Sequence, residues 1–121
     1  MSVEENKAIV RHWLEIYGER QVDAVEEVIH PDYRLHGGKA ATPWAPGSHA
    51  LEEAKASLKK VKEEYPTFKI TIDDMIAEGD RVVLRETWNY EGKLVRNAMV
   101  IYRLQEGKII DDWFCYTPLD V

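Results

Sequence analysis

The sequence predicts one α+β domain over residues 1–121, with helices packed on one face of an antiparallel sheet. Three observations predict it. The chain has 121 residues, which is enough for a single core. Apolar residues recur at helical spacing in the first half, and after Pro66 they alternate with polar residues at the period of a strand.

The first helix is expected to begin at Ser2, because Ser2 and Glu5 have the spacing of a capping box. Apolar residues at helical intervals continue to Tyr17, and Gly18 ends the pattern. A second, shorter helical pattern covers residues 22–29. It must end by Pro31, because the residue before a proline disfavours the α region.

A short strand is expected next, over residues 32–36. The segment 37–47 contains three glycines, two prolines and Trp44, which is the chemistry of a loop and makes it a candidate lid. Alternation divides the short strand into two faces: Tyr33 and Leu35 on one, Arg34 and His36 on the other.

A third helix is expected to be capped by Ser48 and to end before Pro66, with apolar residues three and four apart. Four strands follow. Their connections are short and centre on Gly79, Gly92 and Gly107, so neighbouring strands are predicted to pair as antiparallel hairpins.

Charge and composition exclude several classes of partner. The 16 Lys and Arg against 22 Asp and Glu give a net charge of −6, which disfavours nucleic acid as a partner. No apolar run is long enough to cross a bilayer, and the first 20 residues are too charged for a secretory signal. Cys115 is the only cysteine, so a reducing compartment is expected and the cytoplasm is the predicted location.

Motifs for nucleotide, acyl-serine or zinc chemistry are not found in the sequence, so neither a metal nor a cofactor is expected. The last strand instead contains Asp111 and Asp112, which must point to opposite faces of the sheet. An inward carboxylate in an apolar hollow would have a raised pKa, suited to general acid or base catalysis. The alternative is that both are solvated, or that one pairs with Arg85, Arg96 or Arg103.

Other candidate site residues have two interpretations each. His36, at the end of the short strand, could shuttle protons or be an ordinary hydrogen-bonded histidine. Three polar residues on one strand face could bind a ligand on a concave surface or face solvent: Arg85, Thr87 and Asn89. Aromatic side chains could line a pocket or form core: Trp13, Tyr17, Trp44, Tyr102, Phe114 and Tyr116.

Four strings in the chain resemble the SnoaL-like polyketide cyclases, of the nuclear transport factor 2-like superfamily. They are P-D-Y-R-L-H (31–36), P-G-S (46–48), A-E-G-D-R-V-V (77–83) and Y-R-L-Q-E-G-K-I-I-D-D-W (102–113). The resemblance spans nearly the whole chain. It implies a cystatin-like cone, with a strongly curved sheet around a long helix and a conical pocket that opens under the loop before the third helix.

The resemblance also implies a site. Cyclases of this family close a polyketide ester by an aldol reaction without a cofactor, and His36 matches a histidine that is common on their short strand. Asp112 stands where they have the histidine of a terminal His-Trp-Asp string, and Phe114 replaces its catalytic aspartate. Val100 replaces a further polar pocket residue. The base and tyrosine of ketosteroid isomerases fall at Gly37 and Trp13, and the Asp-Arg-Asp set of epoxide hydrolases at Phe114, Thr87 and Asn89.

Members of the family usually pair through the outer face of the sheet, which implies a homodimer interface at Trp88, Tyr90, Met99 and Ile101. The first functional hypothesis is a cofactor-free lyase or isomerase for an apolar carbonyl compound. In it Asp112 is the acid or base, His36 its partner, and Tyr102 and Tyr116 donate hydrogen bonds to an enolate. The alternatives are a non-catalytic pocket for an aromatic or lipid-like molecule, and a dimerisation module with a filled interior.

Overall fold

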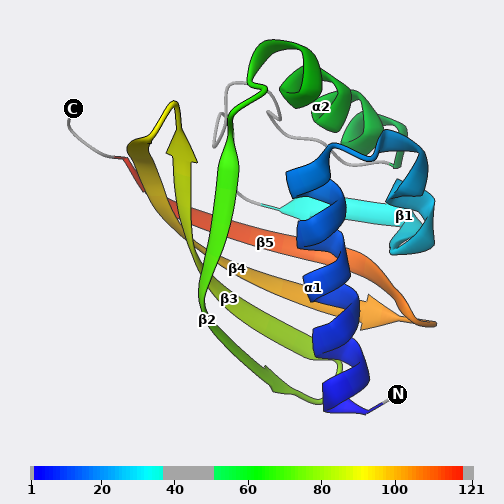
Figure 1. Cartoon of the computed structure of the whole chain (residues 1–121). Helices are drawn as coiled ribbons and strands as arrows, with labels where there is room; N and C mark the ends of the chain where they lie inside the picture. Colours follow the sequence, from blue (N-terminus) through cyan, green and yellow to red (C-terminus); the bar gives the residue numbers. More distant parts are fainter. Residues whose placement is uncertain (1, 37–50, 119–121) are drawn as a thin grey trace.

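The computed structural model describes residues 2–36 and 51–118, apart from the side chains of residues 95 and 116–118. Candidate features at Gly37, Trp44 and Ser48, and the lid expected there, lie outside the described residues. The elements follow one another as α1 (Val3–Glu19), η1 (Val22–Glu27), β1 (Ile29–His36), α2 (Leu51–Glu64), β2 (Lys69–Glu78), β3 (Arg81–Tyr90), β4 (Lys93–Gln105) and β5 (Lys108–Pro118) (Figure 1).

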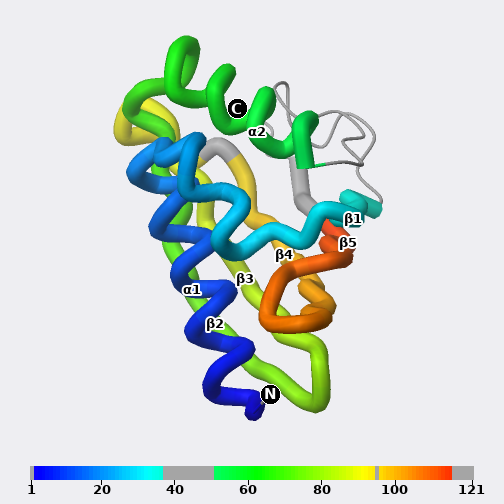
Figure 2. Tube along the Cα trace, turned by 90° about the vertical axis from the view of Figure 1, so that its right-hand side faces the viewer, coloured from blue at the N-terminus to red at the C-terminus, as the bar shows by residue number. Residues whose placement is uncertain are grey.

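The α1 helix lies across the concave side of a strongly curved sheet, and α2 lies beyond one end of α1 (Figures 1 and 2). The capping box at its start is confirmed: Ser2 Oγ accepts from the Glu5 amide and Glu5 Oε1 accepts from the Ser2 amide, both at 3.1 Å. The apolar stripe of α1, with Val10, Trp13 and Ile16, is buried. Burial of this stripe holds the helix on the sheet.

The sheet has five strands in the order β1-β5-β4-β3-β2. Strands β2 to β5 pair with their chain neighbours as antiparallel hairpins, as predicted. The expectation of a wholly antiparallel sheet is wrong at one edge, because β1 pairs with β5 in parallel. β1 is joined to β5 through α2 and three other strands, so no hairpin dictates its direction.

The second helical pattern forms a 3₁₀ helix over Val22–Glu27, and β1 begins at Ile29, earlier than expected. Pro31 therefore lies within a strand. The position is tolerated because β1 is an edge strand, so the missing N–H can face away from the sheet.

Two apolar clusters fill the space between the helices and the sheet. The larger joins α1, η1, α2 and the sheet, and the smaller comprises Val61, Phe68, Trp88 and Ala98. Along β3 every second residue is buried, namely Val82, Leu84, Glu86 and Trp88. On β3, the side chains that face the helices are therefore apolar except for one, the carboxyl group of Glu86.

Candidate functional site

Asp112 is buried on the inner face of β5, with 7 % of its surface exposed. The Tyr33 hydroxyl on β1 donates to Asp112 Oδ2 at 2.9 Å, while Oδ1 has no hydrogen-bond partner. Burial raises the pKa of Asp112 to about 7; the Tyr33 hydrogen bond opposes this rise, and the charge of Glu86 adds to it. Asp112 can therefore be either protonated or ionised near neutral pH.

Glu86 is a second buried carboxyl group on the same face, and it is only 2 % exposed. The Trp88 indole N–H donates to Glu86 Oε2 at 2.8 Å, and Oε1 has no hydrogen-bond partner. Burial raises the pKa of Glu86 to about 7, opposed by the Trp88 hydrogen bond and reinforced by the charge of Asp73. Glu86 is the polar residue that our sequence analysis missed.

A usable signal for Glu86 was present in the sequence. Val82, Leu84 and Trp88 alternate as the apolar face of β3, and Glu86 occupies the position between Leu84 and Trp88. The same alternation places Arg85, the residue before Glu86, on the outer face of the sheet.

Two tyrosines complete the polar part of the interior. Burial raises the pKa of Tyr33 well above its ordinary value, with the charge of Asp112 and the hydrogen bond to it adding to the effect. Burial also raises the pKa of Tyr102 well above its ordinary value, and the charges of Glu86 and Asp112 both contribute. Both hydroxyls therefore stay protonated near neutral pH and can act as hydrogen-bond donors.

His36 does not join Asp112, so the pairing expected from the sequence is wrong. In the parallel register Leu35 is opposite Asp112, and His36 is opposite Trp113, so His36 lies on the outer face. There its Nε2 is 2.7 Å from Asp111 Oδ1, and its ring stacks on Trp113 at 4.9 Å between centroids.

Asp111 is held on the outer face by this histidine and by Arg103, whose Nε and a terminal nitrogen lie 2.8 and 2.7 Å from Oδ2. Burial alone would raise the pKa of Asp111, but the hydrogen bonds from His36 and Arg103 and the charge of Arg103 lower it below its ordinary value. The two adjacent aspartates thus have opposite environments: Asp111 is paired with an arginine and Asp112 is enclosed.

Several predicted lining residues do lie on the inner side. Trp13 and Tyr102 are buried, Tyr17 contacts Trp13 edge-on at 5.6 Å between centroids, and Val100 is 2 % exposed. Phe114 packs against Trp88 at 5.1 Å. The side chain of Tyr116 lies outside the described residues, although its backbone belongs to β5.

Arg85, Thr87 and Asn89 do not face the interior, so their expected role on a concave surface is wrong. Arg85 Nε donates to Asp74 Oδ2 at 2.6 Å, and Thr87 Oγ1 donates to Asp73 Oδ2 at 2.5 Å. These partners lie on the outer face of β2. The residues between these three polar side chains, Glu86 and Trp88, take the inner positions, and alternation sends Arg85, Thr87 and Asn89 outward.

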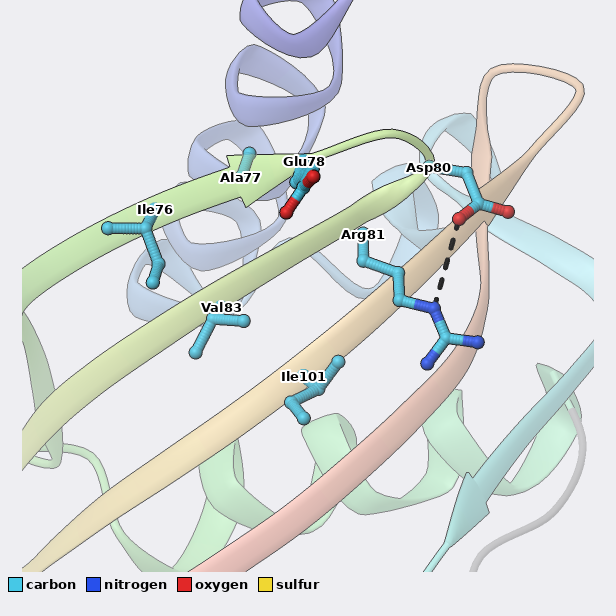
Figure 3. A pocket seen from close by; sticks show the side chains of 7 residues that line it. All are labelled: Ile76, Ala77, Glu78, Asp80, Arg81, Val83 and Ile101. Atoms are coloured by element: carbon cyan, nitrogen blue, oxygen red, sulfur yellow. Dashed lines mark ion pairs between the residues drawn. The ribbon is translucent and has the colours of Figure 1, made fainter.

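The described hollow on the outer face lies near the β2–β3 turn (Figure 3). Ile76, Val83 and Ile101 form its apolar floor, and Arg81 lies at its edge, 3.9 Å from Asp80. Met99 is also exposed on this side of the sheet.

Trp88 and Tyr90, which were expected on the outer face, belong to the inner side. Trp88 is 5 % exposed in the smaller apolar cluster, and Tyr90 packs against that cluster. The physical reason is the same alternation that turns Glu86 inward, because Trp88 and Glu86 are two residues apart on one strand.

Within residues 2–36 and 51–118, no group of three or more His, Cys, Asp or Glu is placed to hold a metal ion. The helices in these two segments are also too short or too polar to cross a membrane. The inner face carries the buried carboxyls of Glu86 and Asp112 and the buried side chains of Tyr33 and Tyr102.

The curved sheet around α1 has the fold of nuclear transport factor 2-like proteins, as comparisons with known proteins show. The SnoaL-like domain family matches residues 10–111, so the chain belongs to this family. No curated protein is significantly similar to the chain in sequence.

Solved structures show the same fold. A candidate polyketide cyclase from Acidithiobacillus ferrooxidans has 20% identity and a TM-score of 0.76, covering 96% of this chain and 91% of its own. An NTF2-like protein of unknown function from Burkholderia pseudomallei has 20% identity and a TM-score of 0.76, covering 97% and 92%. A candidate ketosteroid isomerase from Kribbella flavida has 12% identity and a TM-score of 0.77, covering 98% and 82%.

Proposed function

We propose that the chain is a cofactor-free lyase or isomerase that acts by general acid–base chemistry on an apolar carbonyl compound. The observation that carries the proposal is Asp112, which is enclosed on the inner face with a pKa raised to about 7. A group with this pKa exchanges a proton in either direction at neutral pH. The fold and the SnoaL-like family support this class of reaction without fixing the substrate.

The roles differ from those expected on the sequence. Tyr33 replaces His36 as the partner of Asp112, because its hydroxyl contacts Oδ2 directly. Burial and the charges of both buried carboxyls raise the pKa of Tyr102. Its hydroxyl is the candidate hydrogen-bond donor to a developing enolate oxygen. Trp13, Tyr17, Val100 and Phe114 supply the apolar surroundings.

The proposal is tested by proton exchange at a carbon next to a carbonyl group. The protein is mixed in D₂O with apolar ketones such as 2-tetralone, and loss of the α-proton signal is followed by NMR. We expect exchange about 10²–10⁴-fold above buffer for the wild type, and near the buffer rate for Asp112→Asn.

The matched control is Glu63→Gln, which changes an exposed carboxylate on α2 and should exchange like the wild type. Equal exchange by wild type and Asp112→Asn would show that Asp112 is not the acid–base group.

The second candidate function is a non-catalytic binding protein for an aromatic or lipid-like molecule. Phe114 favours it, because it occupies the position of the cyclase aspartate and packs on Trp88 among other aromatic rings. Binding to the folded state must raise the melting temperature. A thermal-shift screen in which apolar ligands raise Tm, while no ketone undergoes exchange, would select this function.

We also propose a cytoplasmic location and a homodimer that pairs through the outer sheet face. Cys115 is a free, exposed thiol, which suits a reducing compartment. Met99 and Ile101 expose apolar surface on a face that no described helix covers.

A further inference from the structure

The outer face of the sheet is arranged in rows that cross its strands. Residues that are partners in successive strand pairs lie side by side, and residues two apart on a strand share a face. One such row, the apolar row, runs from β2 to β1 through partners in all four strand pairs: Ile76, Val83, Ile101, Trp113 and His36. The charged row beside it has the same strand order: Glu78, Arg81, Arg103, Asp111 and Arg34.

The charges of the charged row change sign across β4, which is the middle strand of the five. One strand from β4, Arg81 on β3 has the opposite charge to Asp111 on β5. Two strands from β4, Glu78 on β2 has the opposite charge to Arg34 on β1. Arg103 on β4 itself is already held by Asp111 Oδ2, at 2.8 and 2.7 Å. A two-fold axis along β4 therefore brings opposite charges of two copies together on both flanks.

The apolar row fits the same axis. Rotation about β4 places Ile101 of one copy on Ile101 of the other, and it places Trp113 on β5 over Val83 on β3. Val83 belongs to the floor of the hollow in Figure 3, which has a volume of about 470 Å³. Pockets for drug-sized molecules have roughly 300–1,000 Å³, so this hollow has room for an indole ring.

A second copy of the chain is the occupant that this pattern favours. A contact between identical surfaces about a two-fold axis must be self-complementary, whereas an unrelated partner requires no change of sign about one strand. The exposed apolar side chains lie on the same face, since Ile76 is 66 % exposed and Met99 57 %. Met99 is on β4, so it lies on the axis itself.

We propose that two copies pack outer face to outer face about a two-fold axis along β4, with Trp113 of each copy in the hollow of the other and Arg34 of each facing Glu78 of the other. The inference rests on the proposed homodimer and deepens it, because it specifies how the copies are oriented. Sheets that pack face to face lie about 10 Å apart, a gap that long side chains at the flanks can bridge.

The orientation is tested first by exchanging the flanking charges. Arg34 and Glu78 are exposed, so substitution of either should leave the fold intact. We expect Arg34→Glu and Glu78→Arg each to raise the dimer Kd about tenfold, because two symmetry-related contacts change from attraction to repulsion. The double variant restores opposite charges, and its Kd should return to within about threefold of the wild-type value. Sedimentation over a dilution series measures Kd.

The control for a change of charge alone is Glu63→Arg on α2, which should leave Kd unchanged. A double variant that dimerises as weakly as the single variants overturns the proposed orientation, and the homodimer still stands. A wild type that sediments as a single chain overturns both. The two failures are therefore distinguishable.

The contact between Trp113 and the hollow is tested by exchanging sizes. Trp113→Ala removes the ring and should raise Kd about 30-fold, the effect of losing a central tryptophan from an interface. Val83→Trp fills the hollow and should also weaken the dimer. In the double variant the new ring occupies the space left by the old one, so the combined loss should be smaller than the product of the single losses. Single losses that simply multiply overturn this contact.

Discussion

At the scale of single residues, burial and contacts give two chemically identical groups different pKa values. Asp111 and Asp112 are adjacent, yet Asp111 has a lowered pKa beside Arg103 and Asp112 has a pKa raised to about 7 inside the sheet. Strand alternation is the cause, because consecutive side chains reach opposite faces.

The raised pKa of Asp112 predicts a pH-dependent stability. Between about pH 4 and about pH 7 the folded state keeps a proton on Asp112 that the unfolded chain has lost, so the free energy of unfolding falls as pH rises through this window. The loss is complete above about pH 7, where both states are ionised. In Asp112→Asn this contribution is absent. As pH rises from about 4 to about 7, we expect the free energy of unfolding of the wild type to fall by roughly 2–4 kcal/mol relative to that of Asp112→Asn.

Urea unfolding at a series of pH values measures this change, and Glu63→Gln is the control for loss of an exposed carboxylate. Parallel stability profiles for wild type and Asp112→Asn would contradict a raised pKa at this position.

At the scale of elements, α1 determines the inner site because it carries Trp13 and Tyr17 across the concave face (Figure 1). Its start is fixed by the capping box, and the Asn6 side chain donates to the Gly79 carbonyl at 3.2 Å, which ties the helix to the β2–β3 turn. Loss of the cap would therefore loosen one wall of the site as well as the helix itself.

We expect Ser2→Ala to lower the free energy of unfolding by about 1 kcal/mol, because it removes the acceptor for the Glu5 amide. Ser2→Asp keeps a side-chain oxygen at the cap and should lose much less. Chemical denaturation of the three proteins measures the difference, and equal losses in the two variants would argue that the cap does not hold α1.

At the scale of the whole molecule, the outer face of the sheet exposes large apolar side chains to solvent. Met99 is 57 % exposed and Ile101 37 %, and Ile101 borders the hollow of Figure 3. Trp88 and Tyr90 lie on the inner side and do not contribute to this face. The proposed dimer contact is therefore smaller than the sequence predicted, and it centres on Met99 and Ile101 of β4.

The proposed homodimer predicts that charge on this face separates the subunits. We expect the wild type to have about twice the 14.0 kDa mass of one chain in light scattering, and Met99→Lys and Ile101→Lys to shift it toward one chain. Glu63→Lys on α2 should leave the mass unchanged, since α2 lies away from that face. A wild type with the mass of a single chain would exclude the interface.

The amino-acid sequence by itself determined the local features of this protein. Residues close together in the chain determine the cap at Ser2, the alternation of β2 to β5 and the hairpin pairing of these strands, and the structure confirms all three. The family resemblance depends on short strings of sequence, and it is confirmed too. The opposite faces of Tyr33 and His36 followed from the same local reasoning.

Only the tertiary structure decided which face of each strand is enclosed. The parallel pairing of β1 with β5 brings Tyr33 to Asp112 and His36 to Asp111. Packing of Trp88 against Phe68 and Phe114 keeps Glu86, on the same face of β3, inside. These contacts join residues far apart in sequence, and the pKa of a carboxyl depends on the surroundings that such contacts create.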